Sequence, residues 1–112
     1  MNIPLHISLH GIAPSDAVYN AVRERAEKLD HYYPHLMSCR VALELAGRHK
    51  RHGNQFVARI DLKMPGGEIA VTHQHDEDVQ VALRDAFRAA QRRLEDYARK
   101  QRGDVKRRAS RA

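Results

Sequence analysis

The residues best suited to ligand chemistry are arginines in the last third of the chain. Arg84, Arg88 and Arg92 recur every four residues, and Arg99 lies close to the same line. On a helix this spacing gathers the side chains into one stripe, opposite the stripe of apolar residues between them. The guanidinium fork holds two phosphate oxygens at once. The pattern therefore favours a nucleic-acid partner, with an ordinary solvated helix face as the alternative.

A second group of cations lies nearer the N-terminus, in another segment with helical periodicity. Arg25 and Lys28 share a flank of its apolar face, while Arg23 projects outward. If the two helices pack side by side, we expect one cationic face tens of ångströms long. The candidate RNA-binding residues are Arg23, Arg25, Lys28, Arg84, Arg88, Arg92 and Arg99.

Part of this charge is expected to be neutralised within the helix itself. Glu95 and Arg99 have the spacing and order of an intrahelical ion pair. Arg84 and Arg88, in contrast, have no acidic residue four positions before them. We therefore expect these two arginines to be available to a ligand.

The eight histidines suggest a metal site as an alternative. His73 and His75 share one side of an extended segment, and His49 and His52 lie in a basic loop. Two or three histidines with a carboxylate could hold zinc. The cations around the loop histidines oppose metal binding, so we expect neither a metal nor a cofactor.

Catalytic signatures are sparse. The sequence has no nucleophile elbow, no phosphate-binding glycine loop and no H-E-x-x-H motif. The acidic run over 76–78 precedes a helix, where acids meet the positive end of the dipole. Cys39, the only cysteine, falls on the apolar side of a strand and can form no intramolecular disulfide. We therefore expect a binding protein and not an enzyme.

Length and composition indicate one folded domain. The chain has 112 residues, of which 42% are hydrophobic, and a formal net charge of +6. A cationic excess of this size favours polyanionic partners. The N-terminus does not resemble a signal peptide, and no apolar run is long enough for a membrane span. A single cysteine suits a reducing compartment, so we expect a cytoplasmic protein.

Hydrophobic periodicity predicts six elements around these residues. Apolar residues alternate in four segments and recur at steps of three and four in two others. The expected order is a strand over 3–10, a helix over 16–33, strands over 37–46, 55–64 and 68–73, and a helix over 77–101. A polar basic loop is expected over 47–54, and a tight turn at Pro65-Gly66-Gly67.

This order predicts an α+β fold of the type β-α-β-β-β-α. Four strands with one polar face leave the other face for two amphipathic helices, which makes a two-layer sandwich. We expect one folded domain over 1–102. Gly103 is expected to end the last helix, and residues 103–112 to form a basic, disordered tail.

Three segments resemble the ribosome hibernation promoting factor family, which includes the ribosome-associated inhibitor protein. They are AVRERAEKLDHYYPHLMSCRVAL, FVARIDLKMPGGEIAV and DEDVQVALRDAFRAAQRRLEDY. The Pro-Gly-Gly turn, followed by a strand and an acidic-capped helix, is the most distinctive feature. The resemblance covers about residues 1–102 and lies in the order and spacing of these segments.

The resemblance implies a fold similar to double-stranded-RNA-binding domains. In the family, the domain sits in the channel of the small ribosomal subunit for messenger and transfer RNA, and basic residues of both helices face ribosomal RNA. Arg25, Lys28 and Arg92 match basic positions of the family, whereas the other candidates come from the arginine stripe. The function implied is that of a ribosome-binding translation inhibitor.

The chain departs from the family at two points. Gln80 stands where members commonly carry an aromatic residue. The chain also ends without the C-terminal domain by which long members dimerise, so we expect a monomer off the ribosome. The alternatives are a generic RNA-binding protein or chaperone, a His-based metal-binding protein, and a protein-interaction module that acts on a sigma factor.

Overall fold

Four strands and two helices follow one another in the predicted order, and the α+β class is confirmed. The elements are β1 (Leu5–His10), α1 (Asp16–Tyr32), β2 (Ser38–His49), β3 (Gly53–Met64), β4 (Gly67–His75) and α2 (Val79–Ser110). The structure, a computed structural model, describes residues 3–49, 53–75 and 78–110. Side chains are described over 3–46, 55–75 and 78–103.

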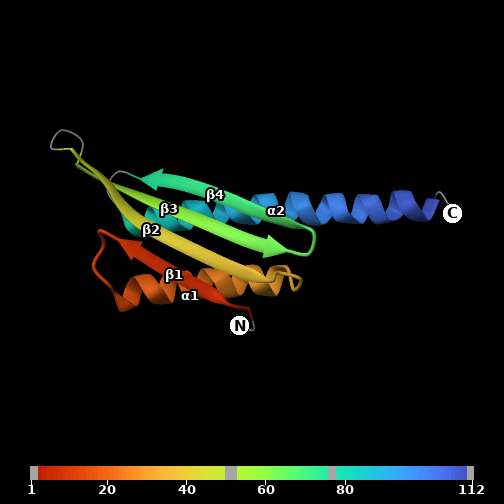
Figure 1. The fold of residues 1–112 in the computed structure, drawn as a ribbon, viewed down its shortest axis with the longest axis horizontal. Coiled ribbons are helices and arrows are strands. Elements are labelled where there is room, and N and C mark those ends of the chain that lie inside the picture. The colour runs from red at the N-terminus through yellow and green to blue at the C-terminus, as the bar shows by residue number, and fades with distance from the viewer. Residues whose placement is uncertain (1–2, 50–52, 76–77, 111–112) are drawn as a thin grey trace.

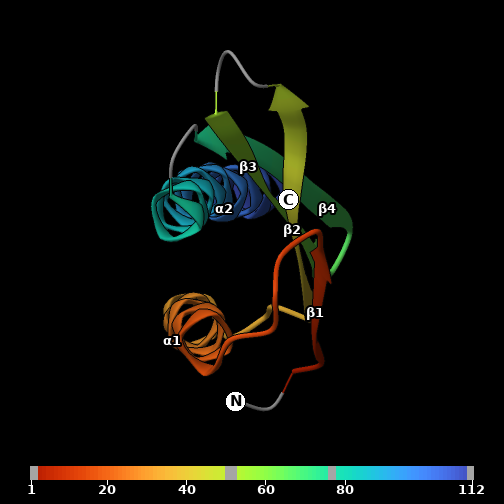
Figure 2. The same ribbon diagram turned by 90° about the vertical axis from the view of Figure 1, so that its left-hand side faces the viewer.

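The strands form one mixed sheet in the order β1-β2-β3-β4. β1 runs parallel to β2, whereas β2, β3 and β4 form an antiparallel meander. The register aligns Ile7 with Val41, Val41 with Ile60, and Ile60 with Val71, so one apolar row crosses the whole sheet. Both helices lie on the face that carries this row, side by side and running in the same direction (Figures 1 and 2).

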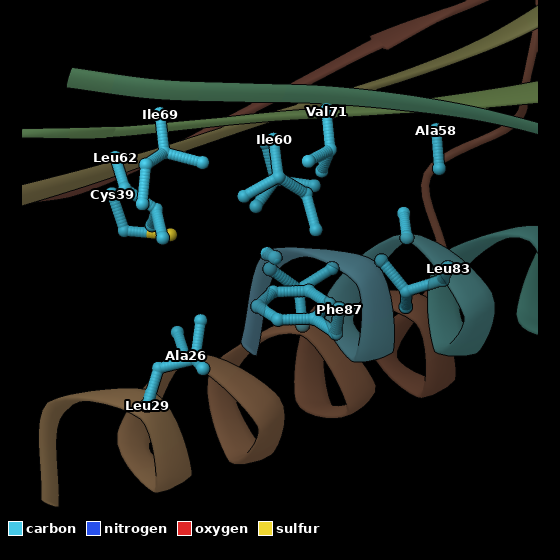
Figure 3. Packing of buried hydrophobic residues seen from close by; sticks show 14 of the residues in the cluster. Ala26, Leu29, Cys39, Ala58, Ile60, Leu62, Ile69, Val71, Leu83 and Phe87 are labelled. Carbon is cyan, nitrogen blue, oxygen red and sulfur yellow. The ribbon is translucent and has the colours of Figure 1, made fainter. Parts of the chain in front are cut away.

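The core fills the space between the sheet and the two helices. Ala26 and Leu29 of α1 and Leu83 and Phe87 of α2 point toward the apolar side chains of the sheet (Figure 3). The largest fully buried side chains are Leu43, Ile60, Leu62, Leu83, Leu94, Val22, Val41 and Cys39. Alternate burial in the strands and burial every three or four residues in the helices therefore explain the two layers.

Polar side chains fix where each helix begins. The Ser15 hydroxyl accepts a hydrogen bond from the backbone N–H of Val18 at 3.5 Å, as expected for an N-cap. At the start of α2, the Asp78 carboxylate accepts from the backbone N–H of Gln80 at 2.8 Å. The expected role of this acid at the helix start is thus confirmed. Asp76 and Glu77 lie outside the described residues.

The turn between β3 and β4 holds the middle of α2 in place. Gly66 has φ +82°, which fits the position of a type II turn that favours glycine after proline. A Cβ atom at Gly67 would lie 2.8 Å from Cε2 of Tyr97, so only glycine allows this close approach. The Tyr97 hydroxyl donates to the Pro65 carbonyl, and Arg93 donates to the Ala70 carbonyl.

The hairpin between β2 and β3 is longer than predicted. The expected loop over 47–54 is wrong in extent, because β2 continues to His49 and β3 begins at Gly53. The register shifts between Ala46 and His49, so the ladder absorbs an irregularity and resumes. Polar composition indicated a loop, but backbone pairing does not require apolar side chains. Residues 50–52 lie outside the described part.

The prediction that the last helix ends at Gly103 is also wrong, since α2 continues to Ser110. A glycine inside a helix costs only about 1 kcal/mol, and the three residues before it, Lys100, Gln101 and Arg102, are good helix formers. The division into a ribosome-binding domain over 1–102 and a basic tail over 103–112 stays a prediction.

Cys39 is fully buried in the sheet, as its place in the alternation predicted. Burial, with a smaller contribution from the Asp61 carboxylate, raises the pKa of the Cys39 thiol to about 12. The thiol is therefore protonated at neutral pH and shielded from reagents. In the parts of the chain that the structure describes, no helix is long and apolar enough to cross a membrane.

We expect Leu94→Ala to destabilise the protein by about 2–5 kcal/mol, because it leaves a cavity between α2 and the sheet. Leu94 has no exposed surface, whereas Met37 is 55% exposed. Met37→Ala is the matched control and should change the free energy of unfolding by less than about 0.5 kcal/mol. Urea denaturation of both variants measures the difference. Equal stability of the two variants would contradict the proposed core.

We also expect Cys39 to resist alkylation in the native protein at pH 8. Its rate of reaction with iodoacetamide should match a free thiol only after denaturation, because the folded protein excludes the reagent and keeps the thiol protonated. Mass spectrometry of the native and urea-unfolded protein measures both rates. Rapid modification of the native protein would show that the edge between β1 and β2 is open.

Candidate nucleic-acid interface

The positive charge of the protein is concentrated on one helix. α2 carries ten Lys and Arg residues and four Asp and Glu residues, which gives +6. The whole chain also has a formal net charge of +6, so all other residues together are neutral. A polyanion is therefore attracted mainly to the surface that α2 presents.

The outer face of the sheet has balanced charge. Arg59 forms an ion pair with Asp61 at 3.3 Å, and Lys63 lies 3.8 Å from Glu68. These pairs lie on the side of the sheet opposite the helices, since they alternate with the buried residues of β3 and β4. This face offers a polyanion little net attraction.

A narrow groove separates the two helices and has cations on both sides. It encloses a hollow of about 60 Å³ with an apolar floor of Leu29 and Phe87. The remaining lining residues are Arg25 and Lys28 of α1 and Arg88 and Gln91 of α2. The structure thus brings three predicted residues together from elements that lie far apart in the sequence. We call this hollow and its lining residues the helix groove.

The cations of the helix groove are free of ion pairs. Within residues 3–46, 55–75 and 78–103, no ion pair involves Arg25, Lys28, Arg88 or Arg92. Arg92 is exposed and lies one helical turn after Arg88. Because none of these side chains is held in such an ion pair, each can contact an anionic ligand without first losing one.

Three other predicted RNA-binding residues, Arg84, Arg99 and Arg23, either form an ion pair or lie away from the helix groove. Nε of Arg84 contacts Oδ1 of Asp85 at 3.2 Å, so this arginine is not free as expected. Arg99 lies 3.6 Å from Asp96 and not beside the predicted partner Glu95. Arg23 is exposed, but about 200° around the helix from Arg25, and it lies outside the helix groove.

The outward surface of α1 is not cationic. Glu24 and Glu27 line a shallow hollow there, together with Lys28 and His31. The helix as a whole has three Lys and Arg residues against four Asp and Glu residues. The expected cationic face across both helices is therefore narrower than predicted, and is confined to α2 and the helix groove.

Asp85 connects the start of α2 to β4. Its Oδ2 lies 3.8 Å from Nε2 of His73, and its Oδ1 contacts Arg84. Partial burial raises the pKa of the Asp85 carboxyl, but Arg84, His73 and Arg88 together outweigh this effect. The pKa therefore lies below its usual value, and the carboxylate is charged at neutral pH.

The histidines do not form a metal centre among the residues whose side chains are described. No three His, Cys, Asp or Glu side chains come together there. His73 faces Asp85, and Nδ1 of His75 accepts from the backbone N–H of Asp78 at 3.2 Å. The side chain of His49, and all of His52, lie outside the described part of the chain.

One hollow at the far end of the two helices was not anticipated. It has a volume of about 470 Å³. The lining residues are Tyr32, Tyr33, Pro34, His35, Ala98, Gln101 and Arg102. We call it the tyrosine pocket. The sequence contains one indication of a cation at this place. Arg102 follows Arg84 by 18 residues, or five helical turns, so the two arginines lie on the same flank of α2. Only the structure shows that the end of α1 lies beside this flank of α2.

These features define a two-layer α+β domain with a cationic helical side and a neutral sheet side. The chain belongs to the family described as Sigma 54 modulation protein / S30EA ribosomal protein, whose model matches residues 5–102. The resemblance noted in the sequence is thereby confirmed. A search of curated protein sequences gives no significant match.

Two solved structures share the fold. A ribosomal subunit interface protein from Coxiella burnetii has a TM-score of 0.73 and 11% identity, over 86% of this chain and 98% of that chain. The N-terminal domain of Protein Y from Thermus thermophilus has a TM-score of 0.69 and 24% identity, over 87% of this chain and 99% of that domain. The arrangement of helices and sheet is thus common to all three.

We expect Asp85→Asn to reduce stability at neutral pH, because it removes a carboxylate that Arg84, His73 and Arg88 stabilise. A carboxyl group with a lowered folded pKa stabilises the fold above its unfolded pKa of about 3.9, and this contribution is lost as the pH falls through the folded pKa. The stability gap between wild type and variant should therefore close below about pH 4.

Urea denaturation between pH 3 and 7 measures this gap. The same substitution in an Arg84→Met background serves as the control, and should produce a smaller pH-dependent gap. A gap that is constant with pH would show that the Asp85 charge does not contribute.

Proposed function

We propose that this chain is a ribosome-binding hibernation factor that inhibits translation. The helix side of the domain binds ribosomal RNA of the small subunit and occupies the channel for messenger and transfer RNA. The observation that carries the proposal is the location of the entire net charge on α2, beside a groove with unpaired cations.

Family membership supports a ribosomal partner. The family description names a ribosomal protein, and one solved structure of the same fold is called a ribosomal subunit interface protein. The small subunit and its RNA are the specific target that we propose for this chain. The proposed site of action is the cytoplasm, with the protein a monomer before it binds.

The contacts we propose are mainly to phosphates. Arg88 and Arg92 on α2, with Arg25 and Lys28 across the helix groove, can each hold phosphate oxygens without first breaking an ion pair. Such contacts recognise the shape and charge of an RNA surface and read little base sequence. The apolar floor of the groove fixes the spacing between the two helices, and so between their cations.

Inhibition then follows from the volume that the bound domain occupies. A folded domain bound in the channel excludes messenger and transfer RNA from the same space. This mechanism requires no bond making, no cofactor and no metal from the protein. The neutral outer face of the sheet would point away from the RNA.

Charge reversal tests the proposal. We expect Arg88→Glu with Arg92→Glu to weaken binding to purified small subunits by at least about tenfold. The slope of log affinity against log salt should become shallower by about 1.4–1.8, since two phosphate contacts are lost. Sedimentation of the protein with subunits at several salt concentrations measures both quantities.

The matched control is Arg40→Glu with Lys63→Glu, which changes the charge equally on the exposed face of the sheet. This variant should bind almost as the wild type does. Equal loss in both variants would indicate that only net charge matters. Equal affinity of the wild type for free duplex RNA and for subunits would favour a generic RNA-binding protein. A sigma-factor complex that survives nuclease and high salt would favour the other role named in the family description.

A further inference from the structure

The tyrosine pocket lies at the end of the helix groove. Lys28 lines the groove, and Tyr32 follows it by four residues on the same flank of α1. On α2, Gln91 lines the groove, and Ala98 and Arg102 line the pocket at steps of seven and four. The two hollows therefore follow one another along the same two helices, the first lined by cations and the second by aromatic side chains.

The floor of the pocket is held by a set of aromatic contacts. Tyr33 is buried, and its ring packs edge-on against His35 at 5.7 Å and against Tyr97 at 6.4 Å between ring centroids. The Tyr97 hydroxyl accepts from Nε2 of Gln101 at 2.9 Å and donates to the Pro65 carbonyl. The pocket is thus preformed, and a ligand would not have to order it.

Tyr32, at the mouth of the pocket, has no structural role of this kind. Its side chain is 49% exposed, and Tyr32 and Met37 are the only large hydrophobic residues exposed to this degree among the described side chains. Exposing an aromatic ring beside a preformed hollow is typical of a surface that stacks a ligand. The ring faces the same hollow as Arg102.

The chemistry of the lining selects the class of ligand. The described lining residues include Arg102 and His35 but no Asp or Glu, so a cationic ligand is disfavoured. A planar ring next to a phosphate satisfies both the aromatic and the cationic groups, as in proteins that bind single-stranded nucleic acid. The volume, about 470 Å³, also lies in the usual range of ligand pockets.

We propose that the tyrosine pocket receives one unpaired nucleobase of the RNA that binds in the helix groove, stacked on Tyr32, with Arg102 on the adjoining phosphate. The inference rests on the proposed function, because it requires RNA in the groove. The other proposed contacts of the interface are to phosphates, whereas this one is to a base. Stacking on Tyr32 therefore favours RNA that has an unpaired nucleotide at this position.

The test compares Tyr32→Leu, which removes the ring, with Tyr32→Phe, which keeps it. Met37→Ala removes the other exposed hydrophobic side chain, which does not line the pocket, and is the matched control. Tyr32→Leu should bind purified small subunits about 5- to 150-fold more weakly, the range for loss of one base–aromatic stack. Tyr32→Phe and Met37→Ala should stay within about twofold of the wild type.

A second readout identifies the ligand. Probing of subunit RNA with dimethyl sulfate and with a carbodiimide, which together report on all four bases, should show at least one unpaired base that wild type and Tyr32→Phe protect and Tyr32→Leu does not. Unchanged affinity of Tyr32→Leu overturns the inference and leaves the proposed function intact. Weaker binding without any change in base protection indicates a protein ligand and also overturns it. Failure of the wild type to bind subunits removes the proposed function itself.

Discussion

The sheet has one face that water solvates and one that is apolar along every strand, and both helices cover the apolar face. The helices shield from solvent the apolar row that runs from Ile7 through Val41 and Ile60 to Val71. The remaining features follow from this packing. It sets the helices side by side, brings Leu29 and Phe87 to the floor of the helix groove, and directs Arg88 and Arg92 away from the core.

The same packing separates charge within a small domain. Because α2 buries its apolar stripe, its cations are collected on the opposite side, while the sheet presents paired charges on its own outer face. An RNA surface would therefore meet the helices first. The aromatic contacts of Tyr33 and Tyr97 extend the rigid core toward the end of the groove, where Tyr32 remains exposed.

Much of the fold could be predicted because periodicity records burial directly. Alternation in β1 and β3 and the stripe through α2 identified these elements and their inner faces. The parallel pairing of β1 with β2 was not predicted, since alternation shows which face is buried and not which strand is adjacent. The end of α2 was misplaced because one glycine has only a small cost, which the helix formers over 100–102 help to offset.

The site was harder to predict than the fold. Stripe spacing placed Arg88 on the solvent side of α2, but only tertiary packing set it across the groove from Arg25 and Lys28. Arg84 was expected to be free, because ion pairs between residues adjacent in sequence are not a regular feature of helices. Its contact with Asp85 depends on the position of that carboxylate between α2 and His73 of β4.

Tethered cleavage of RNA tests directly whether the helix side of the domain faces the ribosome. Cys39 is buried, so a single added cysteine can carry an iron chelate that cleaves nearby RNA by hydroxyl radicals. Gln91→Cys places the probe at the helix groove, and Thr72→Cys places it on the exposed face of the sheet. If the helix side faces the RNA, we expect strong, localised cleavage of small-subunit RNA from position 91 and weak cleavage from position 72. Equal cleavage from both positions, or stronger cleavage from position 72, would contradict this orientation.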